Sequence, residues 1–166
     1  MSERRTVEVY STFIQITGDM EIVRPDRVSD AVNRFGEYLH LRDGRAEPLS
    51  LSYPILSRSE PEMTVAKSAV VVLCPLDDGS DGNPALWREK VSRAAVINTH
   101  SFSMVGDVHM EPRHSLLDHL ERFPGDFVPV TNVSALWVTA INSGTHALQR
   151  PFALLNPASI VSFSLR

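Results

Sequence analysis

Acidic side chains that could take part in catalysis occupy matching places in two parts of the chain. The four carboxylates are Asp19, Asp30, Asp107 and Asp118. A general acid or base needs a partner within hydrogen-bond distance, and the sequence around these residues supplies no evident one. An Asp after a glycine, as in Gly18-Asp19 and Gly106-Asp107, more commonly hydrogen-bonds to nearby backbone. We therefore interpret Gly18, Gly106 and the four carboxylates as structural positions.

Metal binding and nucleophilic catalysis find little support in the sequence. Four histidines lie in the second part of the chain: His100, His109, His114 and His119. A metal site needs three or four converging ligands, and this spacing favours solvated surface histidines instead. No nucleophile elbow, phosphate loop, paired-cysteine site or dinucleotide fingerprint is present, and the single Cys74 is typical of an inert core thiol. The sequence predicts a protein that is not an enzyme and binds no metal or cofactor.

The matching carboxylates belong to an internal repeat, which indicates a duplicated architecture. Apolar and polar positions recur 88 positions later up to the pair Phe35 and Phe123, and 89 positions later beyond it. Residues 13–22, 28–35, 38–41 and 63–72 correspond in this way to 101–110, 116–123, 127–130 and 152–161. We expect a first repeat at 1–75, a linker with a short lead-in helix at 76–93, and a second repeat at 94–166.

Each repeat has the pattern β-β-α-β-β-β. Alternating polarity predicts strands at 6–10 and 14–22, and Gly18-Asp19 and Gly106-Asp107 predict a bulge or sharp bend in the second strand of each copy. The spacing of Val28, Ala31, Val32 and Phe35 predicts a helix that Asp26 caps and Gly36 ends. Further strands are expected at 38–41, around 49–53, and at 64–73.

The second copy follows the same pattern. Leu116, Leu117, Leu120 and Phe123 form the buried stripe of its helix, which opens at 113–115. Its later strands are expected at 127–138, after the turn at 142–145, and at 160–165.

Composition limits the cellular setting. The 166 residues are 43% apolar and carry a net charge of −4, which argues against non-specific nucleic-acid binding. No apolar run approaches the roughly 20 residues that cross a bilayer, and the first residues lack the apolar stretch of a signal peptide. We expect a soluble, cytoplasmic protein without a membrane partner.

Two segments resemble the Sm/LSm family, a group of small SH3-like barrels. They are Tyr38-Leu39-His40-Leu41-Arg42-Asp43 and Leu154-Leu155-Asn156-Pro157-Ala158-Ser159-Ile160-Val161-Ser162-Phe163. Both copies also resemble short bacterial domains of unknown function. The resemblance implies a mainly β protein made of two tandem Sm-like small β-barrels, each with a short inserted helix.

Three alternative functions remain open. Sm-like units join edge to edge, so the first is a scaffold or interaction protein that forms a homo-oligomer, with three chains closing a ring of six units. The second is RNA binding or chaperoning, for which the candidate cations are Arg24, Arg27, Arg34, Arg42 and Lys67. The second loop, however, reads 66–69 Ala-Lys-Ser-Ala and lacks the Arg and Gly of Sm proteins. The third is a sensor that binds a small ligand or peptide in the cleft between the repeats.

Overall fold

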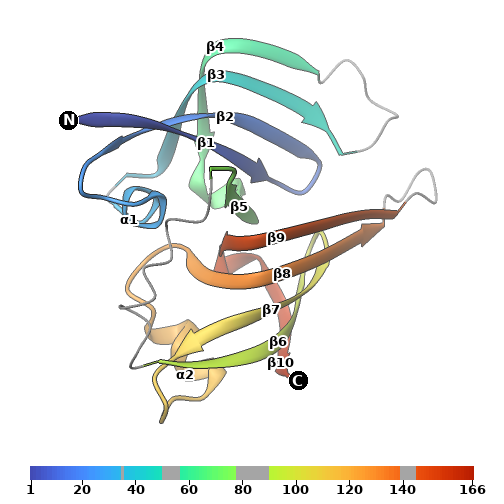
Figure 1. Cartoon of the computed structure of the whole chain (residues 1–166). Coiled ribbons are helices and arrows are strands. Elements are labelled where there is room, and N and C mark those ends of the chain that lie inside the picture. Colours follow the sequence, from blue (N-terminus) through green and yellow to red (C-terminus); the bar gives the residue numbers. More distant parts are fainter. Residues whose placement is uncertain (35, 50–56, 78–89, 139–144) are drawn as a thin grey trace.

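A computed structural model describes residues 1–34, 36–49, 57–77, 90–138 and 145–166. The protein is mainly β, and two short helices interrupt its strands (Figure 1). The elements of the first half are β1 Ser2–Tyr10, β2 Ile14–Val23, α1 Val28–Val32, β3 Tyr38–Pro48, β4 Arg58–Ala66 and β5 Val72–Pro75. Those of the second half are β6 Val91–Thr99, β7 Ser103–Met110, α2 Leu116–Arg122, β8 Val128–Val138, β9 Thr145–Leu155 and β10 Ile160–Leu165.

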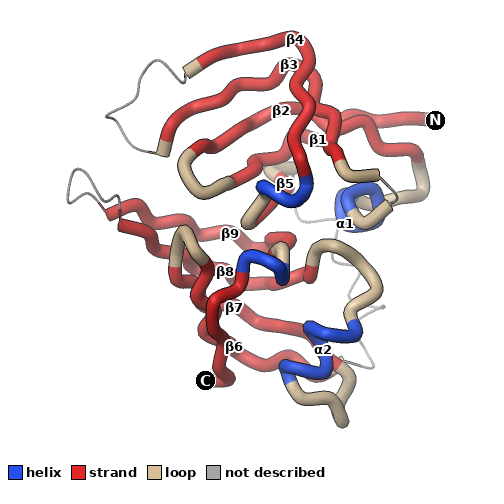
Figure 2. The backbone as a smooth tube through the Cα atoms, turned by 180° about the vertical axis from the view of Figure 1, so that it is seen from behind, coloured by secondary structure: helices blue, strands red, loops and turns tan. Residues whose placement is uncertain are grey.

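The ten strands of the described residues form one antiparallel sheet in the order β10-β6-β7-β8-β9-β5-β1-β2-β3-β4. The first half contributes β5-β1-β2-β3-β4 and the second half β10-β6-β7-β8-β9, so the internal order of the two halves is the same. The halves curve separately and meet where β5 lies beside β9 (Figures 1 and 2). The sheet therefore ends in two edge strands, β4 and β10.

The predicted bends at the two glycines are confirmed. Register shifts lie between Thr17 and Asp19 where β2 pairs with β3, and at the matching place where β7 pairs with β8. The residues opposite the glycines, Asp43 and Asn132, have φ angles of 50° and 51°. A Cβ on Gly106 would lie 2.5 Å from Val130 Cγ1. The glycine thus lets two strands approach closely at a bulge that increases their local twist.

Both helices form within the predicted segments, but α1 ends at Val32 with Asn33 as its C-cap instead of at Gly36, and Leu117, expected in the buried stripe of α2, is 51% exposed. The N-cap of α1 is Arg27 rather than Asp26, and the Asp30 carboxylate accepts a hydrogen bond from its N–H at 3.1 Å. In α2 the Ser115 N–H donates to Asp118 at 3.1 Å, and the Ser115 hydroxyl accepts from the Asp118 N–H. Asp30 and Asp118 therefore stabilise helix starts. Among the described residues, neither helix has the length and apolarity needed to cross a membrane.

The last strands correct two predictions. Leu41 faces Met63 in one half and Val130 faces Ala153 in the other, so β4 and β9 are 90 positions apart instead of 89. The predicted strand at 64–73 is divided, because a 3-10 turn at Lys67–Ala69 separates β4 from β5. The equivalent turn, Pro157–Ser159, precedes β10.

Other predictions concern residues outside the described ranges. They include Phe35, most of the strand expected around 49–53, and the lead-in helix as far as residue 89. Val91 to Arg93, which were assigned to that helix, lie in β6.

The hydrophobic cores of the two halves share residues. Phe127, Phe152 and Leu154, from the second half, pack in the core of the first half. The core of the second half includes four residues of the first: Tyr10, Val71, Val72 and Cys74. Each core thus crosses the predicted boundary between the repeats, and apolar burial holds the halves together.

Candidate functional site

The junction between the two halves is a short backbone ladder. Val72 faces Leu155 and Leu73 faces Leu154 where β5 meets β9. The Asn156 N–H donates to the Val71 carbonyl at 3.0 Å, and the Asn156 side-chain amide donates to the Val70 carbonyl at 2.9 Å. We refer to this contact, from Val70–Leu73 to Leu154–Asn156, as the internal junction. It joins β5, the outermost strand of the first half, to β9, the outermost strand of the second half.

A largely buried ion pair reinforces the internal junction. Arg150 on β9 donates to Glu8 on β1 through Nη2 at 2.7 Å and Nε at 3.1 Å. The Glu8 carboxylate also accepts from the Tyr10 hydroxyl at 3.1 Å and the Gln15 amide at 3.3 Å. Four donor atoms therefore surround this carboxylate, so its charge is well compensated.

Burial and the nearby charge of Glu8 also affect the neighbouring groups. They raise the pKa of the Cys74 thiol to about 12 and the pKa of Tyr10 above its ordinary value. Cys74 is fully buried, so it remains a neutral thiol with little nucleophilic character.

Two loop contacts complete the junction. The Lys67 ammonium is buried and donates to the Arg34 carbonyl at 2.7 Å and to Asp126 at 3.3 Å. The Asn33 side chain, just after α1, accepts from the Phe127 N–H at 2.8 Å and donates to the Phe127 carbonyl at 3.1 Å. Phe127 itself is fully buried. Loops of both halves are therefore locked to each other beside the β5–β9 ladder.

The edge strands β4 and β10 are the counterparts of the strands that meet at the internal junction. The register places Ser162 and Phe163 of β10 where Val72 and Leu73 lie in β5, and Thr64 and Val65 of β4 where Leu154 and Leu155 lie in β9. Both edges end the sheet within this chain. Unpaired edges of this kind are ready to pair with another strand.

Apolar surface accompanies these two edges. On β10, Val161 is 67% exposed and Leu165 44%. Beside β4 lies a mostly apolar pocket of about 350 Å³, lined among others by Phe13, Thr64 and Val65. At the corresponding end of the second half, residues of the first half fill the core. β10 thus exposes apolar side chains, and β4 borders a pocket that His100, Ala158 and Ser159 of the second half also line.

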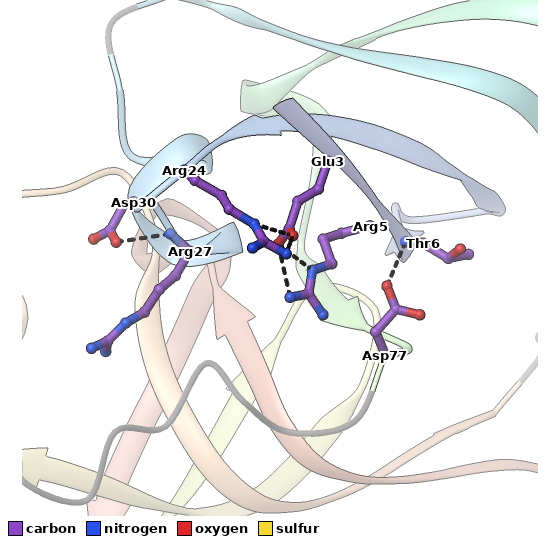
Figure 3. Close-up of polar contacts among 7 residues, drawn as sticks. All are labelled: Glu3, Arg5, Thr6, Arg24, Arg27, Asp30 and Asp77. Carbon is purple, nitrogen blue, oxygen red and sulfur yellow. Dashed lines mark hydrogen bonds and ion pairs between the residues drawn. The ribbon is translucent and has the colours of Figure 1, made fainter. Parts of the chain in front are cut away.

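The candidate RNA-binding cations do not form an uncompensated basic face. Arg24 pairs with Glu3 at 2.5 Å, and Figure 3 shows this carboxylate between Arg24 and Arg5. These two arginines lower the pKa of Glu3, Arg24 more than Arg5. Three other candidate cations are also paired, Arg34 with Asp26, Arg42 with Glu21 and Lys67 with Asp126. Arg27 lies at the start of α1, where its N–H bonds to Asp30 (Figure 3).

The repeated carboxylates after the glycines have side-chain partners instead of the local backbone partners expected. Asp19 accepts from the Thr6 hydroxyl at 2.7 Å, and Asp107 accepts from the Asn132 amide at 2.8 Å. Each tie joins neighbouring strands close to the bulge.

The histidines are not all solvated at the surface, contrary to the prediction from the sequence. His119 is buried rather than exposed, and its ring contacts that of Phe123 with centroids 5.7 Å apart. His109 Nε2 lies 2.8 Å from the Thr131 hydroxyl. Burial lowers the pKa of both imidazoles. Within the described ranges, no three His, Cys, Asp or Glu side chains are grouped closely enough to hold a metal ion.

A cleft does lie between loops of the two halves. Its volume is about 720 Å³, and its lining includes Tyr38, Lys67, Asp126 and Asn156. The buried Lys67 ammonium is already bonded to Asp126 and the Arg34 carbonyl. The cleft lies between the halves, where the third alternative function expects a small ligand or peptide to bind.

The residues that build the junction were not identified from the sequence. Glu8 and Arg150 are 142 positions apart, and Asn33 and Phe127 are 94 apart. None of the four differs in type or local pattern from ordinary surface or core residues. Comparison with models of protein families, with curated proteins and with solved structures found no match.

Proposed function

We propose that this protein is a non-enzymatic scaffold that self-associates head to tail, with β10 of one chain pairing with β4 of the next. The observation that carries the proposal is the internal junction, because both of its strands recur unpaired at the ends of the sheet. We further propose that each half is a small Sm-like barrel, which the shared strand order of the two halves supports.

The internal junction supplies a register for the contact between chains. Ser162 would face Val65 of the neighbouring chain and Phe163 would face Thr64, as Val72 faces Leu155 and Leu73 faces Leu154. Val161 would take the place of Val71, which is 2% exposed at the internal junction. The apolar pocket beside β4 would receive the exposed side chains of β10. Hydrogen bonds and apolar burial would then act together, as in other strand-addition contacts.

Such a contact uses different surfaces on the two partners. A contact of this type closes into a ring when the rotation between chains allows it, and otherwise forms a filament. Three chains of two units each would make the six-unit ring that the Sm resemblance suggests. The rest of β4 carries a proline and charged side chains, which keep free strand edges from pairing. They are Pro61, Arg58, Glu60 and Glu62. Pairing is therefore expected only at the C-terminal end of β4.

Light scattering on the purified chain from low to high micromolar concentration tests the proposal. The variant Val161→Asp should dissociate the oligomer, because burying most of a valine contributes about 1–2 kcal/mol and a carboxylate in that place adds a desolvation cost. The expected loss of affinity is at least about tenfold. Val23→Asp is the matched control, since Val23 is 52% exposed at the end of β2, away from both edges.

The control variant should keep the oligomeric state of the wild type. A wild-type chain that stays monomeric throughout this range would refute self-association. An oligomer that Val161→Asp leaves intact would refute the β10 edge as its contact surface.

A further inference from the structure

Asn33 forms a specific seat for the second half at the internal junction. Its side chain accepts from the Phe127 N–H and donates to the Phe127 carbonyl. Gly125 lies so close to Asn33 that a Cβ on this glycine would lie 2.5 Å from Asn33 Cγ. Phe127 is buried in the core of the first half, together with Val28 and Val32 of α1. The Asn33 amide at the end of α1 thus binds the N–H and the carbonyl of Phe127, two residues after Gly125.

The same parts recur in α2 and at the start of β3. Asp30 and Asp118 make the same bond at the starts of α1 and α2, so Glu121 on α2 occupies the place of Asn33. Gly36 and Tyr38 correspond to Gly125 and Phe127. Tyr38 is 55% exposed, and a Cβ built on Gly36 would have no atom within 4 Å. Tyr38 and Leu120 of α2 both line the cleft of about 720 Å³ between the halves, and within the chain Tyr38 stays more than half exposed instead of filling the place that Phe127 fills beside α1.

The backbone of Tyr38 is oriented for such a contact. The Lys67 N–H donates to the Glu37 carbonyl at 2.9 Å, and Tyr38 is the next residue on β3, opposite Ala66. Because backbone groups in an antiparallel pair alternate between the two sides of a strand, the N–H and carbonyl of Tyr38 point away from β4. They correspond to the N–H and carbonyl of Phe127 on the other half, which bond to Asn33.

We infer that Tyr38 of one chain docks beside α2 of the next, and that Glu121 sets this contact between chains to be weaker than the internal junction. This inference rests on the proposed head-to-tail association. The Glu121 carboxylate can accept the Tyr38 N–H, but an ionised carboxylate has no hydrogen to donate to the Tyr38 carbonyl. Where Asn33 makes two hydrogen bonds, Glu121 makes one and places a negative charge near a carbonyl oxygen. The association between chains is consequently reversible, whereas the halves within a chain stay together.

Replacing Glu121 with Asn tests this inference on the full-length chain. Glu121 is exposed, so the change should leave the monomer fold intact and restore the two-bond arrangement of Asn33. Sedimentation velocity over a concentration series should then give a dissociation constant about tenfold lower than that of the wild type, since one net hydrogen bond corresponds to roughly that factor. Glu111→Asn, at an exposed carboxylate before α2, is the control for the change in net charge. It should leave the dissociation constant unchanged.

Tyr38→Ala gives a second measurement. It should weaken the association about tenfold or more, because the docked ring loses its apolar contact, while the unfolding temperature of the monomer stays close to that of the wild type. If Val161→Asp dissociates the oligomer but Glu121→Asn and Tyr38→Ala leave its dissociation constant unchanged, the role of α2 is refuted and the strand pairing stands. If no variant associates and the wild type is monomeric, the proposed function itself fails.

Discussion

The ion pair between Arg150 and Glu8 offers the sharpest test of how the two halves are joined. Its side chains are 28% and 11% exposed, and its shortest contact is 2.7 Å. Arg150→Met leaves the Glu8 carboxylate among Tyr10, Gln15 and apolar neighbours without its cation. Removing one partner of a buried pair costs about 3–5 kcal/mol. We expect about 3 kcal/mol here, because Arg150 retains some solvent contact.

Urea unfolding followed by circular dichroism measures this loss, and the melting temperature should fall by about 6–12 °C for a chain of this size. The double variant Glu8→Gln with Arg150→Met removes both charges and should be closer to the wild type than Arg150→Met alone, giving a coupling free energy of about 2 kcal/mol. Arg45→Met is the matched control, since Arg45 pairs with Glu47 at 2.6 Å with side chains 69% and 46% exposed. That surface pair should contribute less than about 1 kcal/mol.

If Arg150→Met costs no more than Arg45→Met, the ion pair does not stabilise the junction and the reasoning is wrong. A single unfolding transition in the wild type is also expected. Two separate transitions would show that the halves unfold independently despite their shared cores.

Three further predictions concern the bulge, two histidines and the thiol. Gly106→Ala should lower the free energy of unfolding by about 1–3 kcal/mol in urea titrations, because its Cβ would overlap Val130 Cγ1. An unchanged urea midpoint would contradict the close approach of β7 and β8 at the bulge. Since burial lowers the pKa of His109 and His119, the unfolded chain binds protons more readily, so stability should be full above about pH 6.5 and fall as the pH drops through the folded-state pKa values. His119→Leu should reduce that fall between pH 7.5 and 5.5, and equal slopes would exclude His119 as a source. Cys74, whose burial raises its pKa to about 12, should react with a disulfide reagent only in urea concentrations that unfold the chain, and rapid labelling of the native protein would disprove its burial.

The features that the sequence predicts are those with a local physical cause. Gly18 and Gly106 mark bulges because only glycine fits between strands this close, and the apolar stripe of α2 predicts a helix because its period is that of a helix. The strand at 160–165 agrees with β10 at the same bounds. The polarity pattern revealed the first inserted residue, which changes the offset from 88 to 89, but not the second, so the predicted correspondence of β4 and β9 was one position out. The N-cap of α1 was predicted wrongly because the carboxylate at this helix start is that of Asp30, which accepts from the Arg27 backbone N–H, a donor that almost any residue could supply.

The junction could not be predicted for a different reason. Arg150, Glu8 and Asn33 act only across strands that are far apart in the sequence, and the pairing of β5 with β9 decides which residues meet. Edge strands were predicted in general terms from the curved sheet, but Tyr38 and Val161 gain their significance only from the place of their counterparts, Phe127 and Val71.

The shared cores impose an order on synthesis and folding. When the first half leaves the ribosome, its core still lacks Phe127, Phe152 and Leu154, and the last two lie on β9. The nascent first half therefore has an incomplete interior until translation has passed Leu154. Under the proposed head-to-tail association, the vacant place of β9 beside β5 would accept β4 of another copy during that interval, because Thr64 and Val65 correspond to Leu154 and Leu155. Closure within one chain and pairing between chains would then compete for the same strand edge.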